Sequence, residues 1–171
     1  MRLIGRLLVV GFALLLAIPS GAALLGLGAL VDPVLRDLMG GLGLYAIEAV
    51  ASELAAGYPP DAGMVEAVLG VGRALLLLLA VPPALNAVVG EVLGWRSLAW
   101  YAGATGLLTA LLPWLMRGAR EVGATGPAGL AEGRVTALLF VSGAAAGLVY
   151  WLFAGRWAGR PPVTMMVPDR R

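Results

Sequence analysis

The sequence lacks several of the side chains on which enzymatic and metal chemistry most often depends. Its 171 residues contain no cysteine and no histidine, and lysine and glutamine are absent as well. The chain therefore has no thiolate or imidazole ligand for zinc or haem, no Ser-His-Asp triad, no catalytic cysteine and no Schiff-base lysine. We predict no catalytic residue, no cofactor and no metal site, and hence no enzymatic activity.

Charge is also scarce, and what there is lies in short segments. Only 13% of the residues are charged while 60% are hydrophobic, and the mean hydropathy is +0.91. Soluble domains carry about 25% charged residues, so this composition is typical of an integral membrane protein. The net charge of +2 forms no basic stripe interleaved with aromatics, which excludes nucleic acid as an expected partner. The expected partner is the lipid bilayer.

Four stretches contain no charged residue and are long enough to cross a bilayer. They cover residues 7–31, 74–90, 97–116 and 135–155. About 17 to 25 apolar residues in a helix span the hydrocarbon layer, and in lipid the backbone must satisfy its own hydrogen bonds. We predict a single all-α membrane domain over residues 1–171, an antiparallel bundle with spans at about 7–31, 68–90, 97–116 and 135–155.

The segment between the first two spans, residues 33–57, is different in character. Its apolar residues recur at helical spacing, with Asp37, Glu48 and Glu53 elsewhere on the helical wheel. This pattern indicates an amphipathic helix outside the membrane, on the periplasmic side. A fifth span over residues 38–57 is the alternative, but two glutamates in lipid would be costly.

Arginine positions predict the orientation of the spans. With the N-terminus inside, the cytoplasmic flanks hold seven of the 12 arginines and the opposite flanks hold four. The excess favours cytoplasmic N- and C-termini, and the Ala, Gly, Leu and Arg bias resembles that of a GC-rich bacterial genome, so we expect a multi-pass protein of a bacterial inner membrane. We expect a glycine-rich flexible loop at residues 117–134 and a cytoplasmic tail at residues 157–171.

Small residues mark a candidate helix-packing surface. Gly143, Gly147, Gly155 and Gly159 follow one another on one side of the fourth span, with Gly103 and Gly106 of the third span as a natural opposing surface. Glycines on one stripe let helix backbones approach closely. The sequence leaves open whether this contact lies within the chain or with another subunit.

Two polar residues near the start of the second span share a helical face. Glu66 and Arg73 are seven residues apart, which is two helical turns. One interpretation is an ion or proton pathway through the membrane. The simpler interpretation is that Glu66 lies outside the membrane while Arg73 reaches the headgroups.

Further candidate polar residues lie at and beyond the proline pair at residues 82–83, where we expect a kink. Asn86, the only side-chain carboxamide in the chain, is placed to donate to backbone carbonyls, to a neighbouring helix or to a polar substrate. Glu91 and Arg96 bracket the turn after the second span, where they are expected to pair with each other, or Glu91 with Arg156. These residues complete the candidate polar site.

Aromatic residues predict the depth of the spans. We expect one interfacial girdle from residues of the third and fourth spans, with Trp114 at the other face. The residues of that girdle are Trp95, Trp100, Tyr101, Tyr150, Trp151 and Trp157.

Two stretches, residues 90–102 and 147–156, resemble segments of small uncharacterised four-helix inner-membrane proteins of alphaproteobacteria. The resemblance covers about the last half of the chain, and it implies a membrane-helical fold without implying any activity. The leading functional hypothesis is a non-catalytic accessory or scaffold subunit of a membrane complex, binding other subunits or itself. The alternative is a small transporter or channel subunit that uses the proline-broken second span.

Overall fold

The computed structural model describes residues 2–33, 36–37, 45–117 and 127–158. In this part of the chain all regular structure is helical, which confirms the all-α prediction. The α-helices are α1 (Arg2–Val31), α3 (Tyr45–Ala55), α4 (Ala62–Leu93), α5 (Thr105–Arg117) and α6 (Pro127–Phe153). A π-helical segment, η2 (Ala99–Ala104), precedes α5, and a short 3-10 turn, η4 (Gly155–Trp157), follows α6.

Three of these helices, α1, α4 and α6, are long and apolar enough to cross a membrane. Helices of this length and hydropathy are expected of a multi-pass membrane protein that contacts lipid. The predicted third span, residues 97–116, is divided between η2 and α5. Since α5 has 13 residues, it is about 20 Å long and shorter than a bilayer by itself.

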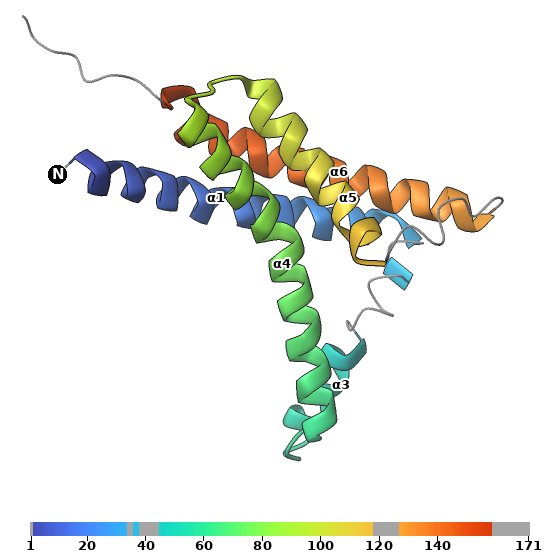
Figure 1. The fold of residues 1–171 in the computed structure, drawn as a ribbon. Coiled ribbons are helices and arrows are strands. Elements are labelled where there is room, and N and C mark those ends of the chain that lie inside the picture. The colour runs from blue at the N-terminus through green and yellow to red at the C-terminus, as the bar shows by residue number, and fades with distance from the viewer. Residues whose placement is uncertain (1, 34–35, 38–44, 118–126, 159–171) are drawn as a thin grey trace, which may run out of the picture.

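Helices α1, α5 and α6 pack side by side as the body of the molecule (Figure 1). On α1 the buried residues recur at every fourth position, from Ala13 through Ala17, Gly21 and Leu25 to Ala29. This small-residue stripe lies against α6, because a Cβ atom on Gly21 would touch Ser142 and Ala146. Close backbone approach is how membrane helices gain packing contacts without a hydrophobic driving force.

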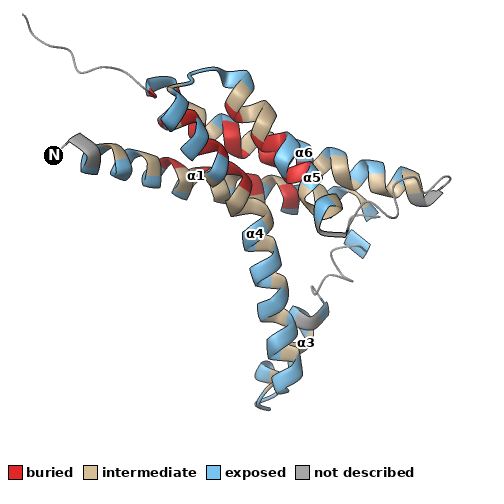
Figure 2. Ribbon diagram, viewed as in Figure 1, coloured by how far each residue is buried: buried red, intermediate tan, exposed pale blue. Residues whose placement is uncertain are grey.

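Helix α4 belongs to the body over only part of its length. Its buried residues all lie between Pro82 and Gly90, and Figure 2 shows the preceding half exposed as it extends sideways with α3. We call α3 together with residues 62–80 of α4 the α3–α4 arm. The predicted four-helix antiparallel bundle therefore differs from the structure, in which the first half of α4 leaves the other helices.

The connecting segments differ in part from their predicted limits. Helix α6 begins at Pro127, so residues 127–134 of the predicted loop are helical. Within the predicted amphipathic segment, α3 covers Tyr45–Ala55. Residues 34–35, 38–44, 118–126 and 159–171, which hold the rest of these two segments and most of the predicted tail, lie outside the described residues.

Candidate functional site

The polar side chains of the body gather where the start of α1 meets the ends of α4 and α6. We call this group, made of Arg6, Asn86, Glu91, Tyr101 and Tyr150, the polar junction. Its position follows from the turn after α4, which ends at Gly94 in the left-handed conformation, with φ of 66°. Glycine adopts this conformation without a steric cost, so the chain can reverse and bring η2 back onto α4.

Arg6 and Glu91 form the central ion pair of the polar junction. The Nε atom of Arg6 donates to Oε2 of Glu91 at 2.9 Å and its Nη2 donates to Oε1 at 2.5 Å. Their side chains are 31% and 19% exposed, so this two-point, charge-assisted contact is only partly shielded from solvent. Arg6 also donates to the carbonyl of Ala154 at 3.0 Å, which joins α1, α4 and the end of α6.

This pairing corrects the prediction that Glu91 would meet Arg96 or Arg156. Arg96 instead donates from Nε to the carbonyl of Ala158 at 2.7 Å, and Arg156 lies over the ring of Trp157. Arg6 comes closer to Glu91 because α1 runs past the end of α4. The predicted orientation placed Arg6 and Glu91 on the same face of the membrane. Because several arginines lie on that face, the sequence alone could not show which of them pairs with Glu91.

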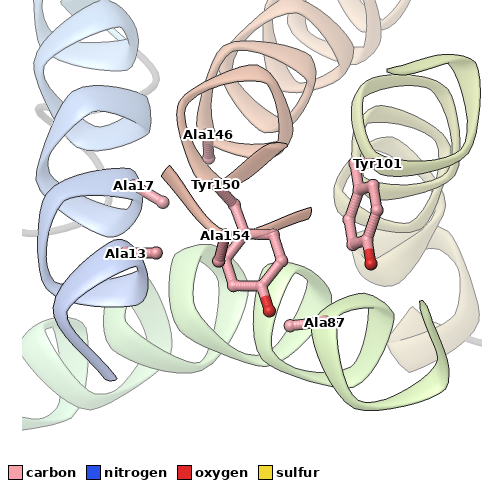
Figure 3. Packing of buried hydrophobic residues seen from close by; sticks show 7 residues of the cluster. All are labelled: Ala13, Ala17, Ala87, Tyr101, Ala146, Tyr150 and Ala154. Carbon is pink, nitrogen blue, oxygen red and sulfur yellow. The ribbon is translucent and has the colours of Figure 1, made fainter. Parts of the chain in front are cut away.

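Two tyrosines fill the space beside the ion pair. Tyr150 donates to Oε1 of Glu91 at 3.1 Å, and Tyr101 donates to the carbonyl of Trp95 at 3.1 Å. Their rings lie 5.2 Å apart, and both side chains are 1% exposed. Figure 3 shows them facing Ala87 from α6 and η2. The prediction that these two residues are interfacial anchors is therefore wrong, because both belong to the core.

Asn86 supports the π-helical segment. Its Nδ2 atom lies 2.8 Å from Oγ1 of Thr105 and within 3.2 Å of the carbonyls of Trp100 and Tyr101. A π-helical turn departs from the regular α-helical hydrogen bonding, so its carbonyls gain from a side-chain donor. We expected Asn86 to donate to backbone carbonyls, to a neighbouring helix or to a polar substrate. In the structure it donates to backbone carbonyls of η2 and to a side chain of α5.

The predicted glycine surface lies mostly between α6 and the η2–α5 segment. A Cβ atom on Gly143 would collide with Thr109, on Gly147 with the backbone of Tyr101, and on Gly155 with the Tyr101 ring. Gly106 opposes Phe140 and Ala144. Around Gly103 there is open space, and Gly159 lies outside the described residues. The contact of this glycine stripe is thus within the chain.

Glu66 and Arg73 are separate from the polar junction. Both are exposed on the α3–α4 arm, whereas Asn86 is buried where α4 enters the body. Since Arg73 and Asn86 are 13 residues apart on one helix, about 20 Å separates them. The structure does not bring these three candidate residues together.

The donors of the polar junction bond to acceptors of the same chain, which are backbone carbonyls, the Glu91 carboxylate and the Thr105 hydroxyl. Glu91 is the one carboxylate of the polar junction. Among the described ranges no group of three or more aspartates and glutamates is arranged to hold a metal ion. A shallow apolar groove of about 610 Å³ lies between α5 and the first half of α6, away from the polar junction.

Comparison with known proteins assigns the chain to no family. No family model, no curated protein and no solved structure matches it.

Proposed function

We propose that this chain is a non-catalytic accessory or scaffold subunit of a bacterial inner-membrane protein complex. The observation that supports it is the contrast within α4. Its second half is packed into the body, while its first half carries an apolar surface that the described residues cover on one side only, by α3 and, from Leu75 onward, by the body. Lipid can cover an apolar helix face, but this face also carries the exposed charges of Glu66 and Arg73, which favours a protein partner.

We also propose four crossings, with η2 and α5 acting together as the third and with α4 returning to the cytoplasmic side through its packed second half while its first half, which extends sideways (Figure 1), lies along the membrane. Residues 99–117 are continuous helical structure, close to the length needed to cross. Arg6 contacts both Glu91 and the carbonyl of Ala154, which supports an arrangement with both termini on one side. Reporter fusions at Gly57, Gly126 and Arg171 test this topology, and a periplasmic Arg171 would contradict it.

Purification of the full-length chain in mild detergent, followed by native mass spectrometry, tests the subunit proposal. We expect the chain to be recovered in an assembly of defined mass. Substitution of exposed apolar residues of the arm, such as Leu69→Ser with Leu77→Ser, is expected to release the chain from that assembly as a monomer. The control is Leu107→Ser on α5, which is also exposed. A lone monomer under all mild conditions would overturn the proposal.

The transporter or channel alternative gains less support. It relied on Glu66, Arg73 and Asn86 lining one path, and the amide of Asn86 is bonded to η2 and α5. A flux assay in proteoliposomes that gave transport sensitive to Arg73→Ala would restore it.

A further inference from the structure

The first half of α4 has two distinct faces. Half-buried residues recur at helical spacing on one side of this half: Met64, Val68 and Val71 lie toward α3, and Leu75 packs against the body at the cluster of Leu25, Ala110 and Leu139. The opposite side of the same helix is exposed and carries Glu66, Leu69, Gly70, Arg73 and Leu77. We call this second set the open face. Since α3 covers only one side of the helix, a partner has access to the other.

The open face holds one negative and one positive charge in otherwise apolar surroundings. Glu66 and Arg73 are about 10 Å apart along the helix axis, too far to bond each other directly. Neither side chain has an ion pair or hydrogen bond to any described residue. Charges on an apolar membrane helix are costly unless paired, so each calls for an opposite charge from outside the arm.

The spacing of these charges makes the open face complementary to itself. If two copies pack antiparallel about a point between Leu69 and Gly70, Glu66 of each lies opposite Arg73 of the other. The same pairing sets Leu77 against Ala62. Such an isologous contact, in which residue i meets j and j meets i, is the geometry of a two-fold dimer.

The centre of this arrangement suits a close crossing of helices. Gly70 lies there, and outside the local backbone of its own helix no described heavy atom lies within 4 Å of the position that its Cβ would occupy. Glycine at a crossing point lets two helix backbones approach, which shortens the distance between the flanking charges.

The arrangement also agrees with a shared membrane orientation. The first half of α4 extends sideways from α1 and α6 (Figure 1). A two-fold axis along the length of α1 and α6 therefore leaves those helices parallel in the two copies and sets the two arms antiparallel. Both subunits then have the same side toward the cytoplasm.

We propose that the open face of the α3–α4 arm binds a second copy of this chain, through two reciprocal Glu66–Arg73 ion pairs flanking a Gly70 crossing. This inference rests on the proposed function, in which the arm is the subunit-binding surface, and it names the partner. The dimer explains why two charges are retained on an apolar helix.

Charge reversal tests the pairing in the full-length protein in mild detergent, with the dimer measured by native mass spectrometry and analytical ultracentrifugation. E66R alone and R73E alone each place like charges opposite each other, and we expect the apparent dissociation constant to rise roughly a hundredfold. The double variant E66R/R73E restores opposite charges and is expected to dimerise like the natural chain. Single and double variants that dimerise equally, or a double variant no better than the singles, would overturn the proposal.

Cross-linking supplies a test that does not depend on charge. The chain has no cysteine, so Gly70→Cys introduces a single thiol beside the two-fold axis, while Met64→Cys places it on the side covered by α3. We expect Gly70→Cys to give a disulfide-linked dimer under mild oxidation and Met64→Cys to give much less. A cross-link from position 70 to a different protein, with no homodimer, would overturn this inference while leaving the subunit proposal standing. A monomer in every variant would overturn both.

Discussion

The polar junction and the α3–α4 arm differ in how their charged side chains are paired. In both regions an arginine and a glutamate lie on apolar helices. At the polar junction Arg6 and Glu91 come from different helices and meet in a two-point contact inside the chain. On the arm Glu66 and Arg73 come from one helix, on an exposed face without a partner in the described chain. In the dimer that we propose, the first charge pair stabilises the packing of one chain and the second joins two copies.

The largest expected effect comes from removing the carboxylate at the polar junction. Glu91→Ala leaves the Arg6 guanidinium without its partner among the ends of α1, α4 and α6. We expect a loss of about 2 to 3 kcal/mol in unfolding free energy, below the range for fully buried pairs because both side chains keep some solvent contact. Unfolding in mixed micelles measures it, with Glu48→Gln on the exposed surface of α3 as the control. If Glu91→Ala and Glu48→Gln had equal unfolding free energies, the Arg6–Glu91 pair would not stabilise the packing of the chain.

The next effect concerns the closest helix contact of the body. Gly147→Val adds a branched side chain where a Cβ already collides with the Tyr101 backbone. We expect about 2 kcal/mol of destabilisation, the usual scale for overpacking. The matched control is Gly103→Ala, which enters open space and is expected to be neutral or to stabilise the protein slightly. If both variants had the same melting temperature, α6 would not pack against η2 as described.

A third prediction concerns the π-helical segment. Asn86→Leu keeps the approximate size of the side chain but removes the donor to Trp100, Tyr101 and Thr105. We expect a cost of about 1 to 2 kcal/mol and faster amide exchange in residues 99–105, because buried acceptors lose their partner. Hydrogen exchange with mass spectrometry, compared over α1 as an internal reference, reports this directly. Unchanged exchange in η2 would show that the segment holds its shape without Asn86.

The smallest effect is expected on the arm when the protein is monomeric. Arg73→Gln, measured at concentrations below dimerisation, removes an exposed charge that bonds no described residue, and the unfolding free energy is expected to change by less than about 0.5 kcal/mol. The same measurement on Glu91→Ala gives the reference for a paired charge. A large loss for Arg73→Gln would mean that Arg73 stabilises the single chain.

The helical character could be predicted from the sequence because long uncharged runs have few other solutions in lipid, and α1, α4 and α6 bear this out. The division of residues 97–116 into η2 and α5 was not predictable, since the carbonyls of the π-helical turn accept from Asn86, which lies on another helix. The burial of Tyr101 and Tyr150 was missed for a related reason. Aromatic residues near the end of a span look alike in sequence whether they face headgroups or glycines of a neighbouring helix.

The partner of Glu91 shows a second limit of sequence reasoning. Composition placed several arginines on one face, but the choice among them depends on how α1 passes the end of α4. That path is set by the buried stripe from Ala13 to Ala29, which fixes the register of α1 against α6. Packing of small residues distant from the ion pair therefore decides which charges meet.

The π-helical segment η2 also sets the direction in which the side chains of α5 point around the helix axis. A π-helical turn holds more residues than an α-helical one, so the side chains of α5 point in directions that an uninterrupted α-helix from residue 99 would not give them. If the same residues closed as an α-helix instead, with none removed, the side chains before this turn would shift by about 100° relative to those after it. Tyr101 and Thr109 then could not both face α6, so the fit of the two helices depends on a single extra residue.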